Sequence, residues 1–368
     1  MGKLDKDIHQ KESAIRFCIL TGSLPFLEVN VENRRELSDT ATVITDIDVL
    51  GVFVDASGTS RRIIFDCKTL GKTSPINRAF WAAGLMRYVS CNEAFVILRK
   101  KATEAHRLSA KDINVHLYSE KQFSNYSESY SLDFNTDYCY STNVDNWITH
   151  TSIYDRNSGF EKFGQFLNSE IPLESDSARG IKRLLSALHK GKGEFNPDKE
   201  AHSAIFYHVV MVFSYLMAKA VHDLKAIIDF DAKKEDFEKL LRYYIWGGRE
   251  AFSQKQKMSQ LFASNNTSLA CSDPELREWE LFVELVRKLL DSPVNVFKCC
   301  FPLREISIRN IVTKDDAKDI YLAKSIASNN RIRQFASSQA KYLVKAAQLP
   351  SEFDSNLSNV FDDLKEKI

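Results

Sequence analysis

The sequence has almost no net charge, and its cysteines show no regular spacing. Lysine plus arginine number 50 and aspartate plus glutamate 49, so the formal net charge is +1 at pH 7. No overall basic field marks the chain as a nucleic-acid binder, although a local basic face is compatible with this balance. The seven cysteines are odd in number and irregularly spaced. They argue against a disulfide framework and for a reducing cytoplasm.

The sequence also shows no pattern typical of a signal peptide, of a membrane span or, from residue 181 on, of a glycine-rich nucleotide-binding loop. The first residues, MGKLDKDIHQKES, are charged and have no apolar core, so we expect no signal peptide. Charged residues and histidines interrupt the longest apolar segment, residues 205–228, which fits a buried or amphipathic helix better than a membrane span. No repeat of fixed period occurs. From residue 181 on, no Walker-type or Rossmann glycine loop occurs.

What remains is the composition of an ordinary soluble globular protein. The chain has 368 residues, of which 44% are hydrophobic and 27% charged. This length allows two or three domains.

One stretch, residues 45–72 (TDIDVLGVFVDASGTSRRIIFDCKTLGK), organises the interpretation. It contains two apolar runs, Val49–Val54 and Ile63–Phe65, separated by the turn-forming sequence Asp55–Gly58. β-Branched and aromatic residues on both sides of a glycine-containing turn predict a β-hairpin.

Charged residues lie at the end of this hairpin that is remote from the turn. Asp46 and Asp48 share a face of the first strand, and Asp66 and Lys68 share a face of the second, with Cys67 pointing the other way. If the strands pair, Asp48 and Asp66 converge, and two close carboxylates favour a cation between them. Oxygen ligands of this kind suit Mg²⁺ or Mn²⁺. A neighbouring lysine can orient a metal-bound water or stabilise charge on a phosphate, so the pattern predicts metal-assisted phosphodiester hydrolysis.

The alternative is a chance motif. A D-x-K triplet is common in chains of this length, and surface acid–lysine pairs are frequent. The context favours a site, because the run IIF leads directly into Asp66 and Asp48 lies within an equally apolar strand. A charge buried there without a partner would be unfavourable.

The segments DIDVLGV and IIFDCKTLGK together resemble the PD-(D/E)XK nucleases, the restriction-endonuclease-like superfamily. The resemblance implies that Asp48 and Asp66 ligate Mg²⁺ or Mn²⁺ together with the backbone carbonyl of Cys67. It also implies that Lys68 is the catalytic lysine. Two departures are the absence of a proline before Asp48 and the use of Asp rather than the commoner Glu as the second acid.

Further site residues are implied by the same resemblance. A glutamate on the preceding helix often completes such a site, and Glu12 is the best candidate here, although a solvated helix position explains it equally well. A basic or amide residue often follows the D-x-K triplet, and Lys72 and Arg78 are available to contact phosphate. Arg78 could equally pair with a neighbouring carboxylate.

The expected order of elements extends the resemblance over about residues 4–124. The patterns predict, in order, a helix, a strand, the hairpin, a helix, a strand, a helix and a strand, over residues 4–21, 24–31, 49–65, 75–91, 94–98, 103–111 and 113–118. With the hairpin counted as two strands, the first six elements match an αβββαβ restriction-endonuclease-like core, so the expected fold class is α/β followed by a mainly α-helical C-terminal domain. We assign residues 1–124 to the nuclease-like domain.

The rest of the chain changes character twice. Residues 125–180 are rich in Ser, Asn and Tyr and carry nine acidic against three basic residues, a net charge of −6, which predicts an irregular acidic connector. Residues 181–368 predict a helical domain that recognises substrate or a partner. The expected helices span 181–189, 199–228, 234–250, 274–290 and 315–347, and a short segment, 300–312, is compatible with β structure.

A competing site lies in this second half. Arg183 and His189, separated by five residues in RLLSALH, superficially fit the R-x4–6-H pattern of HEPN ribonucleases, in which His is the acid–base and Arg stabilises phosphate. Such a pair is common by chance on a helix. Zinc is not expected, because His202 and His208 point apart on a helix and the adjacent pair Cys299–Cys300 has no matching pair.

Taken together, the sequence predicts a cytoplasmic Mg²⁺-dependent nuclease that acts on DNA more readily than RNA and does not bind membranes. The resemblance implies a microbial role in restriction, antiviral defence or repair, and a homodimer or a partner protein bound through the helical domain. A ribonuclease and a catalytically inactive nucleic-acid- or protein-binding module remain open alternatives.

Overall fold

The computed structural model describes residues 7–33, 41–68, 74–132, 136–157, 159–229, 233–265 and 275–368. They form two compact units. Unit 1 runs to Asp55 and includes Thr59–Leu173 and Arg304–Leu322, and unit 2 comprises Ala56–Gly58, Glu174–Leu303 and Ala323–Ile368.

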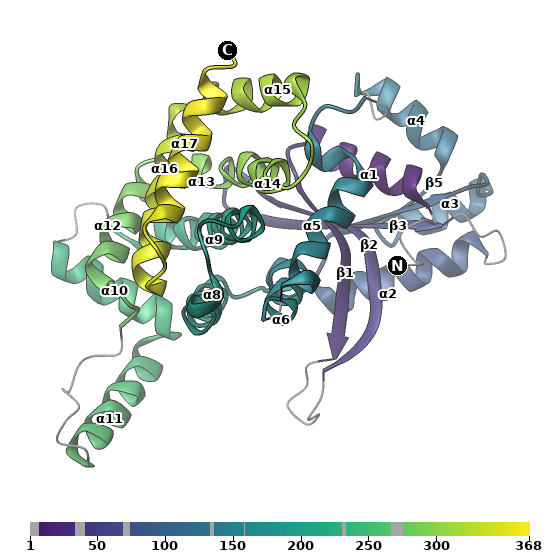
Figure 1. The fold of residues 1–368 in the computed structure, drawn as a ribbon. Coiled ribbons are helices and arrows are strands. Elements are labelled where there is room, and N and C mark those ends of the chain that lie inside the picture. Colours follow the sequence, from purple (N-terminus) through teal and green to yellow (C-terminus); the bar gives the residue numbers. More distant parts are fainter. Residues whose placement is uncertain are drawn as a thin grey trace. The chain divides into compact units, whose positions relative to one another are not determined.

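Unit 1 contains a five-stranded mixed sheet (Figure 1). Its strands lie in the order β1-β2-β3-β4-β5; the pairs β1–β2 and β2–β3 are antiparallel, and β3–β4 and β4–β5 are parallel. The elements are α1 (Ile8–Leu20), β1 (Leu24–Asn33), β2 (Thr42–Val54), β3 (Ser60–Lys68), α2 (Pro75–Val89), β4 (Glu93–Leu98), α3 (Glu104–Lys111), β5 (Val115–Ser119), α4 (Glu120–Ser129), the 3₁₀-helix η1 (Tyr140–Thr142), α5 (Val144–Arg156), α6 (Glu161–Gln165), the π-helix η2 (Phe166–Glu170) and α7 (Ile171–Leu173).

The predicted hairpin is β2–β3. Its turn is closed by the Asp55 N–H, which donates to the Thr59 carbonyl at 3.1 Å, and by the Asp55 side chain, which accepts from the Thr59 N–H at 2.9 Å. Gly58 has a φ of 88°, a conformation that L side chains rarely adopt. The turn therefore depends on Asp55 and Gly58, two of the residues from which it was predicted.

Helices cover both faces of the sheet. Side chains at alternate positions, including Val49, Phe65 and Phe95, pack in one hydrophobic cluster with α1, α4 and α5. The intervening positions, including Ile64 and Val96, point to the other face, and α2 lies on that side of the sheet (Figure 1). The order α1-β1-β2-β3-α2-β4 is the predicted αβββαβ order.

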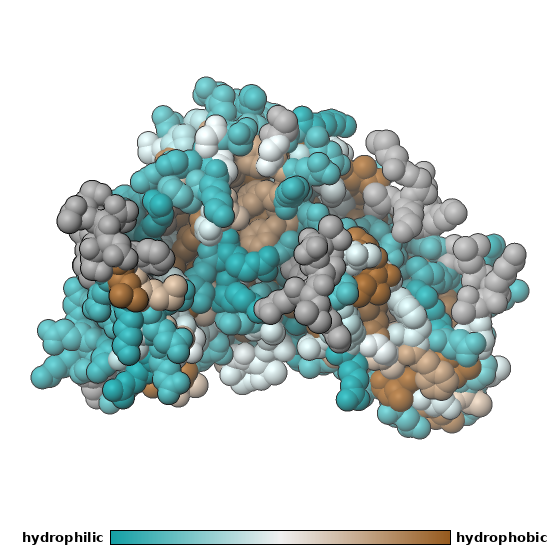
Figure 2. All heavy atoms as spheres, turned by 90° about the horizontal axis from the view of Figure 1, so that it is seen from below, coloured by the Kyte–Doolittle hydropathy of each residue, from teal (hydrophilic) through white to brown (hydrophobic). Residues whose placement is uncertain are grey.

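Unit 2 is helical and is built around α9 (Glu200–Ile227). This helix is long and apolar enough to cross a membrane, yet its apolar window is fully buried, so it is the core helix of this unit. On the face drawn in Figure 2, hydrophobic residues form separate patches among hydrophilic ones. The remaining helices are α8 (Ser177–Lys190), the 3₁₀-helix η3 (Lys192–Glu194), α10 (Lys234–Trp246), α11 (Arg249–Asn265), α12 (Trp279–Leu290), α13 (Val294–Phe297), α14 (Cys300–Arg309), α15 (Asp316–Ala327), α16 (Asn330–Ala347) and α17 (Glu352–Lys365), of which the end of α14 and most of α15 belong to unit 1.

Three predictions about the second half of the chain are wrong. The acidic segment 125–180 is not an irregular connector, since it forms α5, α6, η2 and α7 and belongs to unit 1 as far as Leu173. Residues 300–309 form α14 rather than a strand, and Ile308 of this helix packs in the hydrophobic cluster of unit 1. The expected helix over 315–347 is broken into α15 and α16, with Asn329 capping α16 through its side chain. The boundary at residue 124 therefore does not separate the two units.

Candidate metal and phosphate site

The two predicted metal ligands, Asp48 in the middle of β2 and Asp66 near the end of β3, lie close enough for Lys68 to contact both. Val49–Phe65 is the pair of β2 and β3 farthest from the turn, and Asp48 and Asp66 are the next residues on the two strands. Both aspartates are nearly inaccessible, with exposed fractions of 7% and 3%. The hairpin thus brings two carboxylates together in a buried position, as the sequence predicted.

Lys68 joins the two carboxylates. Its Nζ lies 3.2 Å from Asp48 Oδ2 and 3.7 Å from Asp66 Oδ1. Asp48 Oδ2 also accepts a hydrogen bond of 2.7 Å from the backbone N–H of Cys67. The Cys67 side chain points to the hydrophobic core on the opposite face, as alternation along β3 requires. Cys67 and Lys68 therefore both bond to Asp48, and Lys68 also contacts Asp66.

Arg78 contacts the site from α2. Pro75 occupies the first turn of this helix, where its missing N–H is not needed. One turn later, the Arg78 guanidinium donates from Nε and one terminal nitrogen to the two oxygens of Asp66, and it lies 3.7 Å from the centre of the Trp81 ring. Arg78 thus pairs with a neighbouring carboxylate, which was the alternative to a phosphate contact. A bidentate pair of this kind is among the stronger protein hydrogen-bonding arrangements.

The structure adds two residues that the sequence interpretation missed. Glu28 lies in β1 between the pairs Leu27–Val49 and Val29–Ile47. Its position in the register therefore corresponds to Asp48 of β2. Its carboxylate accepts a 2.5 Å hydrogen bond from Lys11, whose Nζ is also 3.9 Å from Asp48 Oδ1. The signal was present: Glu28 interrupts the apolar strand LPFLEVNV.

Glu28 also has an unusual backbone. Its φ of 53° lies in the left-handed region, which is uncommon for a residue other than glycine. Strained positions of this kind concentrate at functional sites. Glu28 adopts this conformation within β1, at the position that faces Asp48 in the register.

Glu12 is not part of this cluster, so the prediction that it completes the metal site is corrected. Its carboxylate accepts from the backbone N–H of Val144 at 3.3 Å and pairs with Arg16 at 3.5 Å. The helix α1 instead turns the preceding residue, Lys11, toward Asp48, because adjacent helical positions lie about 100° apart. The other predicted phosphate contact, Lys72, lies outside the described residues.

Burial and charge shape the protonation of the site. Burial raises the pKa of the Asp48 carboxyl to about 6, and the Asp66 charge adds to the rise, while Lys68, the Cys67 N–H and Lys11 act against it. Burial acts to lower the pKa of Lys68, but the carboxylates of Asp48 and Asp66 outweigh it, so that its pKa is raised. Lys68 therefore stays protonated at neutral pH.

The donor set fits a hard divalent cation. Two aspartates and a backbone carbonyl are oxygen ligands, and Mg²⁺ is commonly held by one or two carboxylates with waters or phosphate oxygens in the remaining positions. Within the described ranges, no group of three or more His, Cys, Asp or Glu gathers in a metal-binding arrangement. Lys68 and Arg78 contact the aspartate oxygens that a metal would use.

The competing residues in unit 2 have separate partners. Arg183 pairs with Glu174 at 3.8 Å, whereas His189 Nδ1 lies 3.1 Å from the Ala347 carbonyl. Six positions along α8 place the two side chains on different faces of the helix. The pair therefore lacks the convergence that shared acid–base chemistry needs.

With this geometry established, comparison with known proteins identifies no relative: no protein family, curated protein or solved structure matches the chain.

Proposed function

We propose that unit 1 is a metal-dependent nuclease that hydrolyses phosphodiester bonds, with DNA as the preferred substrate. The observation that carries the proposal is the meeting of Asp48, Asp66 and Lys68 at one buried position on paired strands. The αβββαβ order of elements supports the resemblance to PD-(D/E)XK nucleases.

Each side chain has a role in this proposal. Asp48, Asp66 and the Cys67 carbonyl bind Mg²⁺ or Mn²⁺, which supplies a Lewis acid for the phosphate and an activated water. Lys68 stays protonated, so it orients the attacking water and stabilises the charge that develops on the phosphate. Glu28 would act through Lys11, which its carboxylate binds and which lies 3.9 Å from Asp48 Oδ1.

Arg78 would exchange partners during binding. In the free protein it neutralises Asp66. A divalent cation on Asp66 would replace this positive charge, and the guanidinium would then be available for a substrate phosphate. The irregular cysteines favour a cytoplasmic location, and the resemblance implies a role in microbial restriction, antiviral defence or repair.

The test compares cleavage of plasmid DNA, linear DNA and RNA in the presence of Mg²⁺, Mn²⁺ or EDTA. We expect DNA cleavage that EDTA abolishes and that Lys68→Ala lowers by roughly 100-fold or more. Lys100→Ala removes an exposed lysine of the same unit and is the matched control. Loss of activity in His189→Ala but not in Lys68→Ala would refute the assignment.

One alternative has an observation of its own. Because Arg78 and Lys68 already contact both aspartates, the site is also consistent with a nucleic-acid-binding module that keeps the fold without cleaving. Binding of DNA that does not depend on divalent metal, without cleavage under any condition, would favour that module.

A further inference from the structure

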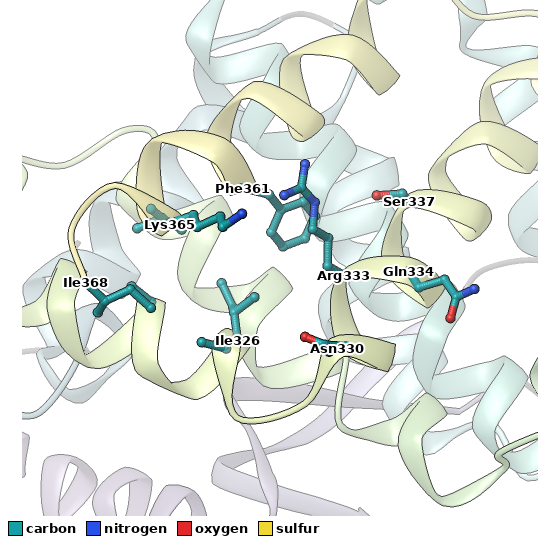
Figure 3. A pocket seen from close by; sticks show the side chains of 11 residues that line it. Ile326, Asn330, Arg333, Gln334, Ser337, Phe361, Lys365 and Ile368 are labelled. Atoms are coloured by element: carbon teal, nitrogen blue, oxygen red, sulfur yellow. The ribbon is translucent and has the colours of Figure 1, made fainter.

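Unit 2 contains a pocket between α15, α16 and α17, with a volume of about 430 Å³ (Figure 3). Each helix contributes residues spaced three or four positions apart, which therefore share one helical face. The wall from α16 is polar, whereas the walls from α15 and α17 are mainly apolar. This volume lies in the range of small-molecule sites.

Two cations lie in the pocket beside an aromatic ring. Lys365 and Phe361 from α17 and Arg333 from α16 line this pocket together, and in the view of Figure 3 the Lys365 side chain extends toward Phe361. Arg333 also pairs with Asp362 at 2.7 Å, and both members of that pair are well exposed. No carboxylate within the described part of the chain lies at ion-pair distance from Lys365. Lys365 is therefore available to pair with an anion.

The polar wall presents unused hydrogen-bonding groups. Asn330 and Ser337 line the pocket, and their side chains make no hydrogen bond within the part of the protein that the structure describes. A ligand that satisfies this wall must carry hydrogen-bonding groups as well as a negative charge. A fatty acid offers only its carboxylate, whereas a nucleoside phosphate offers a base edge, sugar hydroxyls and a phosphate.

We propose that this pocket binds a nucleoside monophosphate. The phosphate lies between Lys365 and Arg333, the base packs against the apolar wall that includes Ile326 and Phe361, and Asn330 and Ser337 bond its polar edges. The charge-assisted bonds to phosphate are the strongest of these contacts. They hold the phosphate through side chains, without a glycine-rich phosphate-binding loop. The proposal does not depend on nuclease activity in unit 1.

The test measures binding to the full-length protein by isothermal titration calorimetry, with EDTA present to prevent metal-mediated binding at Asp48 and Asp66. The probes are AMP, GMP, adenosine, inorganic phosphate and dodecanoate. We expect AMP or GMP to bind more tightly than adenosine or phosphate alone. Loss of one charge-assisted contact in Lys365→Gln weakens binding about tenfold.

Two further variants separate a specific loss from damage to the helical unit. Lys345→Gln removes an exposed lysine of α16 outside the pocket and should bind as the wild type does. Ser337→Phe fills the pocket without changing its charge and should abolish binding while the circular dichroism spectrum is retained. Nucleotide binding unaffected by both pocket variants, tight binding of dodecanoate alone, or phosphate binding as tightly as AMP would each overturn the proposal.

Discussion

Three carboxylates lie in a row across adjacent strands: Glu28 on β1, Asp48 on β2 and Asp66 on β3. Three cations, Lys11, Lys68 and Arg78, neutralise them. The Asp66 charge contributes to raising the pKa of Asp48, and each of the three acids has its own basic partner. A divalent cation can bind here only by displacing part of that compensation.

Arg78→Gln tests this displacement. Asp66 is almost fully buried, so loss of its bidentate partner should lower the free energy of unfolding by about 2–4 kcal/mol in EDTA. The same change frees the Asp66 oxygens, so Mn²⁺ should bind several-fold more tightly and restore most of the stability. Urea unfolding with EDTA or Mn²⁺ measures both effects, and Arg87→Gln, an exposed arginine on α2, is the control. A loss of stability that Mn²⁺ leaves unchanged would contradict a metal site at Asp66.

Asp48 should make stability depend on pH. Its pKa is raised to about 6 in the folded protein from an ordinary value of 3.8. The folded state therefore holds the proton more tightly, and this contribution to stability is complete below pH 4 and is lost as the pH rises through 6. Asp48→Asn removes the titration, so its stability relative to wild type should increase between pH 4 and pH 7.5, by on the order of 2 kcal/mol.

Urea unfolding at several pH values measures this difference, with Asp112→Asn, an exposed carboxylate of unit 1, as the control. Wild-type and Asp48→Asn curves that run parallel across this range would show that Asp48 titrates normally.

At the scale of elements, close packing of α1 on the sheet positions Lys11. A Cβ added at Gly51 of β2 would lie only 2.9 Å from the Cys18 sulfur of α1. Glycine at this position therefore allows the helix to approach β2 closely. The same approach brings Lys11, two turns earlier in α1, within reach of Glu28 and Asp48.

Gly51→Ala should destabilise the protein by about 1–3 kcal/mol, because the added methyl group overpacks the α1–β2 contact. Cys18→Ala removes the sulfur that it meets, so the double variant should recover part of the loss. A double-mutant cycle by urea unfolding measures the coupling. Additive effects of the two substitutions would show that α1 does not press on Gly51.

At the scale of the whole molecule, unit 1 is assembled from distant parts of the sequence. Glu305 of α14 is fully buried and accepts from the backbone N–H groups of Tyr140 and Ser141 at 2.6 and 3.2 Å. His150 Nε2 lies 2.9 Å from the Ser307 hydroxyl. Residues 304–322 therefore satisfy buried polar groups that the first 173 residues leave open.

A fragment of residues 1–173 should consequently fail to fold stably. Each buried donor left without an acceptor is unfavourable by about 1–3 kcal/mol, and removal of α14 and α15 leaves several. A fusion of residues 1–173 to 300–325 through a flexible linker should recover a cooperative thermal transition. If the fragment alone melts as the fusion does, unit 1 does not require the returning segment.

The sequence alone was sufficient for the hairpin, the order of the first elements and the pairing of Asp48, Asp66 and Lys68. These features depend on local rules: the period-two alternation of a strand and the glycine-containing turn fix which residues share a face. The extent of unit 1, the replacement of Glu12 by Lys11 and Glu28, and the contact of Arg78 with Asp66 were decided by tertiary structure. They depend on how helices distant in the sequence pack against the sheet, and alternation within one segment carries no information about that packing.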